Sequence, residues 1–226
     1  MPAVLMLHGW TGAPQDLEPV AGALRAVGIT VSVPWLHGHA DATLNDVTWY
    51  EWRRAAEQAL LELVENGAHG IAVLGYSMGG LLALDLAARF PLHGLVLVAP
   101  GIRVRPWYVG LAIPLSSLVR TLRLPTRLQD VEAVPLRSVR ELLRLARAVK
   151  RRLADVAVPT LLLQGALDRV VYPQGARWLS ERLHAARVDL VWLADSGHNV
   201  LHGADSVEAV TRIVGFLDGC FAAGGA

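Results

Sequence analysis

Residues 71–80 read IAVLGYSMGG, and this stretch decides the fold. Four apolar residues lead into Gly-x-Ser-x-Gly, and leucines and alanines at helical spacing follow. A buried strand that turns sharply into a helix needs small residues on both sides of the turn, which Gly75 and Gly79 supply. We therefore predict a nucleophile elbow in which Ser77 has a strained backbone and an outward-pointing hydroxyl. A serine between glycines often marks only a turn, but the strand before it and the helix after it favour the elbow.

Short apolar runs and amphipathic segments alternate along most of the chain. Such runs are typical of strands that are buried on both faces of a parallel sheet. The predicted strands are residues 3–7, 29–33, 71–74, 95–99, 160–163 and 188–193. The predicted helices are residues 14–27, 45–65 with Asn45 as N-cap, 78–90, 138–152, 173–183 and 205–217. This order predicts an α/β fold, with a mostly parallel sheet of about six strands flanked by helices.

The alternation breaks between residues 101 and 153. This segment contains four prolines, no strand-like run and more than half of the arginines of the chain. Residues 138–152 form its clearest helical pattern, with one apolar side. We expect residues 101–153 to be a helical cap inserted into a core of residues 1–100 and 154–226, with the arginines on its solvated face.

The bulk composition fits one domain with a sizeable core. The 226 residues are 53% hydrophobic, with a mean hydropathy of +0.38 and a net charge of +1. This charge balance does not favour nucleic acid as a partner. Cys220 is the only cysteine, so an intramolecular disulfide is excluded. The chain opens on a strand-like run, and no apolar stretch reaches the ~18 residues of a spanning helix. We expect a cytoplasmic protein without a stable membrane anchor, and its oligomeric state stays open.

Three chemically capable residues follow three of the predicted strands. Ser77, Asp168 and His198 come after the strands at 71–74, 160–163 and 188–193, respectively. The carboxyl ends of parallel strands meet at one edge of a sheet, so these side chains are expected to converge. A serine hydroxyl needs a base to become a nucleophile, and a carboxylate orients that base. We predict Ser77 as nucleophile, His198 as base and Asp168 as the acid that fixes the histidine.

Other titratable residues compete for these roles. Asp195 is close to His198 but belongs to the same loop, where it would more naturally brace the turn. His202 lies four residues after His198, which is a spacing found in metal sites, but no further ligands complete a set, so we expect no metal. Asp155 precedes a strand and is expected at the wrong end of the sheet.

Acyl transfer also needs two donors for the negative charge of the transition state. We expect these to be the backbone N–H groups of Met78, which follows the nucleophile, and of Trp10, in the loop after the first strand. His8 in that loop is expected to be structural. His37 and His39 are likewise taken as loop structure.

The chain resembles the α/β-hydrolase superfamily and is similar to small bacterial carboxylesterases and monoacylglycerol lipases. The resemblance rests on five motifs: HGWTG at 8–12, HGH at 37–39, GYSMGG at 75–80, QGALD at 164–168 and SGH at 196–198. It implies the α/β-hydrolase fold and ester hydrolysis through an acyl-enzyme, with no cofactor and a helical cap over the acyl pocket. The run at residues 3–7 corresponds to the third strand of the superfamily, so we expect about six strands instead of eight, as in the small esterases. A departure is GHA at 38–40, where the family often has Gly-His-Gly.

Apolar residues near the predicted site suggest the substrate. The expected pocket residues are Trp35, Trp107, Tyr108, Ile113 and Val171. An equally good interpretation is that most of them only seal the insertion onto the sheet. A pocket of this kind suits a small-molecule ester of short to medium chain length, or a monoacylglycerol.

Two other functions remain open. One is another serine hydrolase chemistry on the same fold, acting on thioesters, amides or carbon–carbon bonds. The other is a non-catalytic binding protein on this scaffold, which the presence of all three predicted catalytic residues disfavours.

Overall fold

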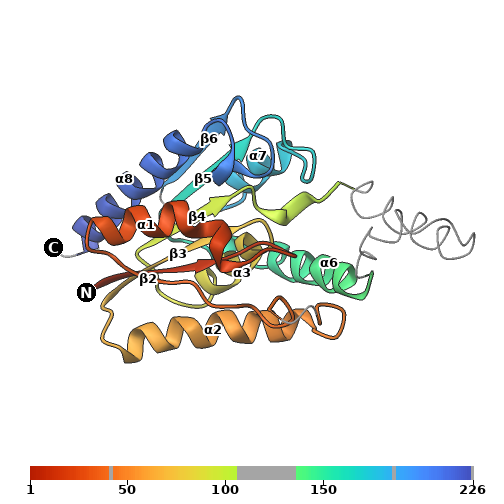
Figure 1. Cartoon of the computed structure of the whole chain (residues 1–226), viewed down its shortest axis with the longest axis horizontal. Helices are drawn as coiled ribbons and strands as arrows, with labels where there is room; N and C mark the ends of the chain where they lie inside the picture. The colour runs from red at the N-terminus through yellow and green to blue at the C-terminus, as the bar shows by residue number, and fades with distance from the viewer. Residues whose placement is uncertain (41–42, 106–135, 185–186, 225–226) are drawn as a thin grey trace, which may run out of the picture.

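The structure, a computed structural model, describes residues 1–40, 43–105, 136–184 and 187–224. In these residues one sheet contains six strands, in the order β2-β1-β3-β4-β5-β6, and every neighbouring pair is parallel (Figure 1). The strands are β1 (Pro2–Leu7), β2 (Thr30–Ser32), β3 (Gly70–Tyr76), β4 (Gly94–Val98), β5 (Thr160–Gly165) and β6 (Val188–Leu193). The predicted strands are therefore confirmed, and their carboxyl ends share one edge.

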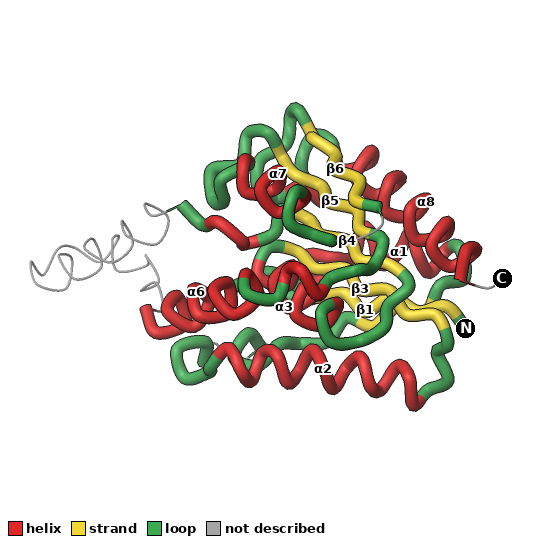
Figure 2. The backbone as a smooth tube through the Cα atoms, turned by 180° about the vertical axis from the view of Figure 1, so that it is seen from behind, coloured by secondary structure: helices red, strands yellow, loops and turns green. Residues whose placement is uncertain are grey.

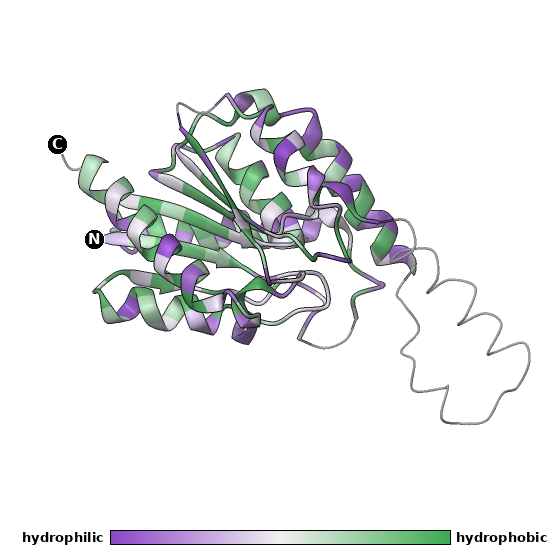
Figure 3. Ribbon diagram, turned by 90° about the horizontal axis from the view of Figure 1, so that it is seen from above, coloured by the Kyte–Doolittle hydropathy of each residue, from purple (hydrophilic) through white to green (hydrophobic). Residues whose placement is uncertain are grey.

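Helices cover both faces of this sheet. One face carries α1 (Glu18–Ala26) and α8 (Ser206–Gly224), and the other carries α2 (Trp49–Glu65), α3 (Met78–Ala87), α6 (Leu136–Lys150) and α7 (Gln174–Ser180). Successive strand residues point to opposite faces of the sheet. Val4 and Met6 therefore pack in the core beneath α1 and α8, while Leu5 and Leu7 pack in the core on the other face. Figure 3 shows the mostly hydrophobic strands between the two layers. Every residue of α3 is buried, which places the elbow helix at the centre of its layer.

Two predicted helix starts differ from the structure. The segment 14–27 is divided into a 3₁₀ turn (Pro14–Leu17) and α1, because Pro19 has no N–H to continue one helix across the junction. The N-cap at Asn45 is wrong, since α2 starts at Trp49 with a capping box between Thr48 and Glu51. Asn45 instead accepts a hydrogen bond from the backbone N–H of Arg137, 3.2 Å away, at the start of α6.

Helix α6 belongs to the core layer as much as to the insertion. It runs beside α2 (Figure 2), and Leu142, Leu145 and Val149 are buried in the same cluster as α2 and α3. Its arginines at 137, 140, 144 and 147 are exposed, as expected for a solvated face. The cap assigned to 101–153 stays a prediction, because residues 106–135 lie outside the described part. Within the described ranges, no helix combines the length and apolar character needed to cross a bilayer.

Candidate active site

The elbow holds Ser77 in an unusual backbone conformation. Its φ of 54° and ψ of −111° lie outside the regions that residues with a Cβ prefer. Such a conformation costs about 1–3 kcal/mol and persists only where the surroundings impose it. Here the N–H of Ser77 donates to the Val98 carbonyl at 2.9 Å, and its carbonyl accepts from the N–H of Gly101 at 2.9 Å. Strand β4 and the segment after it therefore fix the backbone of Ser77.

The flanking glycines are needed because backbones approach closely there. A Cβ on Gly75 would overlap the carbonyl oxygen of Gly79, and a Cβ on Gly79 would overlap that of Leu7. The first contact is the predicted approach of strand to helix. The second, against the end of β1, also ties the elbow to the neighbouring strand.

Ser77, His198 and Asp168 form one hydrogen-bonded series. The Ser77 Oγ lies 3.0 Å from His198 Nε2, and His198 Nδ1 lies 2.8 Å from Asp168 Oδ2. The elbow after β3, the loop after β5 and the loop after β6 supply one residue each. The structure thus brings together the three residues expected at this edge of the sheet.

The surroundings of Asp168 favour its ionised form. Burial alone would raise the pKa of the carboxyl, but the hydrogen bond and charge of His198 outweigh it and leave this pKa below its usual value. The N–H groups of Val170 and Val171 donate to Asp168 Oδ1 at 2.8 and 2.9 Å and lower the pKa further. A carboxylate held in this way orients the histidine with Nδ1 as donor, leaving Nε2 free to accept from the serine.

The competing residues lie elsewhere. Asp195 is exposed, and its N–H donates to Asp205 Oδ2 at 3.0 Å, so it braces the loop of His198. Asp155 pairs with Arg152 before β5, at the opposite end of the strand from Asp168. His202 Nε2 donates to the backbone carbonyl of Asp16 at 3.0 Å. In the described part of the chain, no three His, Cys, Asp or Glu side chains gather as a metal site requires.

His8 is a buried link between two loops. Its Nδ1 donates to the Gly9 carbonyl at 3.0 Å, and its Nε2 accepts from the N–H of Leu36 at 3.2 Å. Burial lowers the pKa of His8 to about 4, so the ring is neutral at pH 7. Burial also lowers the pKa of His39, whose ring stands edge-on to His8 with 4.7 Å between centroids. The structural role expected for His8 fits these contacts.

A cavity of about 230 Å³ opens beside Ser77 and His198. Its other lining residues are Trp10, Thr11, Gly12, Asp16, Tyr76, Met78, Gly101, Val104, Leu142, Val170 and Val171. The expected oxyanion donors Trp10 and Met78 and the expected pocket residue Val171 therefore line the same space as Ser77. Met78 is the first residue of α3, where backbone N–H groups have no partner within the helix.

Of the remaining predicted pocket residues, Trp35 is the one that lies in the described chain, and it does not line this cavity. Trp35 is half exposed and stands edge-on to His8, with 6.1 Å between ring centroids. Trp107, Tyr108 and Ile113 lie outside the described residues.

Two residues at the site are not indicated as site residues by any single sequence motif. Gln164 is buried in β5, and its Nε2 donates to Asp168 Oδ2 at 3.0 Å. A polar residue inside an otherwise apolar strand was the available signal. Leu142 of α6 also lines the cavity. In the sequence it is an apolar position of a helical pattern, which indicates a core residue and not a cavity residue.

Sequence comparisons show similarity to proteins named as lipases and esterases. A family model described as alpha/beta hydrolase family matches residues 4–213. A thermostable monoacylglycerol lipase from Bacillus sp. (strain H-257) is 28% identical over 95% of this chain and 89% of its own length. A pimeloyl-[acyl-carrier protein] methyl ester esterase from Aromatoleum aromaticum is 30% identical over 87% of this chain and 91% of its own length.

The fold comparison agrees. A solved structure from work on LipS and LipT, two metagenome-derived lipolytic enzymes, has a TM-score of 0.81 and 24% identity over 96% of this chain and 93% of that one. Paleococcus ferrophilus monoacylglycerol lipase has a TM-score of 0.72 and 18% identity over 96% of this chain and 94% of its own. At these identities the likeness to solved structures establishes the fold. The family model, which matches most of the sequence, establishes the family. The chain therefore belongs to the alpha/beta hydrolase family.

Proposed function

We propose that this hydrolase is a serine carboxylic-ester hydrolase that acts through an acyl-enzyme on short- to medium-chain esters or monoacylglycerols. The observation that carries the proposal is the unbroken hydrogen-bonded series from Asp168 through His198 to Ser77 beside a cavity. The names of two relatives, a monoacylglycerol lipase and a carboxylesterase, support the ester class.

In the first half-reaction Ser77 becomes acylated. Its Oγ attacks the ester carbonyl carbon while the hydroxyl proton passes to His198 Nε2. Asp168 accepts from His198 Nδ1 and stabilises the imidazolium that forms. The carbonyl oxygen becomes an oxyanion, for which the backbone N–H groups of Met78 and Trp10 are the proposed donors. Collapse breaks the bond to the alcohol oxygen, which takes the proton from His198 and leaves.

In the second half-reaction water replaces the alcohol. His198, neutral again, takes a proton from water, and the hydroxide attacks the acyl carbonyl of Ser77. The same donors hold the second oxyanion, and its collapse returns the proton to Ser77 Oγ and releases the carboxylic acid. The chemistry needs no group beyond these side chains, backbone donors and water.

The cavity supports a small or slender substrate. Its volume of about 230 Å³ is below the ~300–1,000 Å³ of pockets for drug-sized ligands. Val104, Leu142 and Val171 give it apolar walls beside the reacting serine. Such walls accept an alkyl chain, and the oxyanion donors would fix its carbonyl.

The test is hydrolysis of p-nitrophenyl butyrate and a monoacylglycerol by the purified protein and by Ser77→Ala. We expect Ser77→Ala to lower kcat by about 10⁴-fold or more. The matched control is Ser180→Ala, which removes a serine hydroxyl from α7 and is expected to keep full activity. A serine-directed phosphonate should add its mass to the peptide that contains Ser77.

The outcome separates the proposal from its alternatives. Full activity in Ser77→Ala would rule out the acyl-enzyme. Turnover of thioesters or amides with a higher kcat/KM than esters would assign a different chemistry to the same residues. Absence of both turnover and adduct would favour a binding protein.

A further inference from the structure

A second cavity, which we call the cation-lined cavity, adjoins the first. Its volume is about 320 Å³. It is lined by Gly101, Ile102, Arg103, Val104, Leu142, Leu143, Ala146, Arg147, Lys150 and Tyr172. Gly101, Val104 and Leu142 also line the cavity at Ser77, so the two spaces are neighbours across one wall. Gly101 donates to the Ser77 carbonyl, which sets this wall next to the nucleophile.

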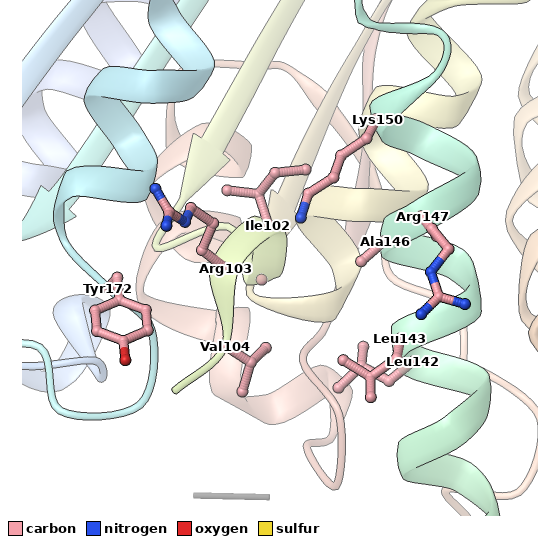
Figure 4. Close-up of a pocket in the computed structure, with 10 residues that line it drawn as sticks. Ile102, Arg103, Val104, Leu142, Leu143, Ala146, Arg147, Lys150 and Tyr172 are labelled. Carbon is pink, nitrogen blue, oxygen red and sulfur yellow. The ribbon is translucent and has the colours of Figure 1, made fainter. Parts of the chain in front are cut away.

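The two sides of this cavity come from distant parts of the chain. Figure 4 shows the side chains of α6, including Lys150 and Arg147, on one side and those of Arg103, Val104 and Tyr172 on the other. The second side is tied to the loop of Asp168. Tyr172 donates its N–H to the Arg103 carbonyl at 2.9 Å, and Val104 pairs with Val171 in an antiparallel bridge. The position of this side is therefore fixed relative to Asp168.

The lining residues that the structure describes carry three positive charges and no carboxylate. Among the described residues, Arg103, Arg147 and Lys150 form no ion pair. Two of them rest on aromatic rings, Arg103 over Tyr172 at 5.9 Å and Lys150 over Trp178 at 5.7 Å. Such contacts position a cation without neutralising it.

The electrostatics of Lys150 point the same way. Partial burial lowers the pKa of its ammonium group, and the charges of Arg103 and Arg147 lower it further. Like charges gathered without a counterion create a positive potential that an anion relieves. Arginine and lysine are the side chains that proteins use to hold carboxylate and phosphate oxygens.

We infer that the cation-lined cavity is a subsite for an anionic substituent, a carboxylate or a phosphate, on the ester that is hydrolysed at Ser77. This inference rests on the proposed function and deepens it. The preferred esters then carry their negative charge at the end remote from the scissile carbonyl. A purely apolar acyl pocket would reject such a group, because burying an unpaired carboxylate is strongly unfavourable.

Two matched pairs of esters test it and distinguish the sources of the charge. On the acyl side, p-nitrophenyl hydrogen adipate is compared with p-nitrophenyl hexanoate, which has the same chain length. On the alcohol side, 1-octanoylglycerol 3-phosphate is compared with 1-octanoylglycerol. The readout is the ratio of kcat/KM for the anionic ester to that for the neutral ester, at low ionic strength, where charge interactions are least screened.

Substitutions in the cavity show whether its charges act. We expect Lys150→Gln and Arg103→Gln each to lower the ratio by about fivefold to tenfold in at least one pair, as the loss of one charge-assisted contact predicts. The matched control is Arg140→Gln, which removes an exposed charge of α6 outside the cavity and should change the ratio less than twofold. If Lys150→Gln and Arg103→Gln alter both ratios no more than Arg140→Gln does, the inference is overturned.

Failure of the proposed function gives a different result. In that case neither neutral ester is hydrolysed, and the subsite is measured by binding alone. Calorimetric titration with adipate and with glycerol 3-phosphate should then show binding that Lys150→Gln weakens and Arg140→Gln does not. Equal binding by the two variants, or none by the unaltered protein, overturns the subsite.

Discussion

The elbow of Ser77 and the cation-lined cavity meet at Gly101, yet they are built in opposite ways. At the elbow, the N–H of Ser77 donates to the Val98 carbonyl and its carbonyl accepts from the N–H of Gly101. The backbones beside Gly75 and Gly79 approach so closely that a side chain would not fit there. In the cation-lined cavity, the charges sit at the tips of exposed side chains of Arg103, Arg147 and Lys150.

This difference separates what must be exact in position from what can vary. A nucleophile and its base need a fixed geometry, because a small displacement costs much of the rate. Charges that attract a substituent act over several ångströms, so flexible side chains suffice. We therefore expect substitutions at the elbow to destroy the protein or its chemistry, and substitutions in the cation-lined cavity to change selectivity.

The strongest test of this contrast is Gly79→Ala against Lys150→Ala. An alanine Cβ at position 79 overlaps the Leu7 carbonyl, which cannot move without breaking the register of β1. We expect a loss of more than about 4 kcal/mol in the free energy of unfolding, or no folded protein. Lys150→Ala should stay within about 0.5 kcal/mol. Thermal and denaturant unfolding followed by circular dichroism measure both, and equal losses would contradict the contrast.

Next in size is Asp168→Asn, which alters the chemistry and spares the backbone. The amide cannot hold the His198 tautomer that leaves Nε2 free to accept from Ser77. We expect kcat for a neutral ester to fall by about 10³–10⁴-fold. Asp195→Asn, in the loop of His198, is the control and should keep activity within about threefold. Comparable losses in the two variants would show that the pair at 2.8 Å is not what orients the histidine.

The dependence of stability on pH tests the elbow side of the comparison, because His8 is buried there. Its pKa is about 4 in the folded state and about 6.5 when unfolded, so between these values the unfolded chain binds more protons. The contribution of His8 to the free energy of unfolding is therefore fully present above pH 6.5 and falls by about 3 kcal/mol as the pH drops to 4. The lowered pKa of His39 adds a fall of the same sign.

Urea unfolding of the purified protein at several pH values between 4 and 7 measures this fall. In His8→Asn the fall should shrink by about 3 kcal/mol, because the group that titrates is gone. His184→Gln, which removes an exposed histidine, should retain the full pH dependence. A slope that is unchanged in His8→Asn would show that His8 protonation does not govern acid stability.

The smallest effect is expected for Gln164→Met, which keeps the volume and removes the donor to Asp168. Its amide oxygen is buried without a hydrogen-bond partner among the described residues, a cost of about 1–3 kcal/mol. This unpaired oxygen is understandable if the Nε2 of the same Gln164 amide positions the Asp168 carboxylate. We expect kcat to fall about tenfold, with the acid limb of the pH–activity profile moved to higher pH. A lower kcat with an unmoved profile would indicate a packing role instead.

The sequence predicted what local patterns encode. Five of the six strands contain an apolar run of at least three residues, and the Gly-x-Ser-x-Gly turn lies between its strand and helix as predicted. The convergence of Ser77, Asp168 and His198 follows from parallel topology, since each residue lies in the segment that follows the carboxyl end of a strand.

What the sequence did not predict depends on contacts between distant residues. Asn45 has the residue type of an N-cap, but its partner is the N–H of Arg137, on another helix. Trp35 follows a strand, as pocket residues do, yet its ring packs beside His8. Arg147 and Lys150 are three residues apart on α6, but Arg103 joins them only because α6 packs against residues 101–103, which no spacing along the chain reveals.

The order of strands in the sheet has a consequence for biosynthesis. From β3 onward each new strand joins the same growing edge, so the elbow and β4 can be in place before the segments that carry Asp168 and His198 have left the ribosome. At that stage Ser77 has a strained backbone and no base. As the proposed nucleophile, Ser77 would gain its base only when β6 docks, so labelling of Ser77 by a phosphonate on arrested nascent chains would report the completion of folding.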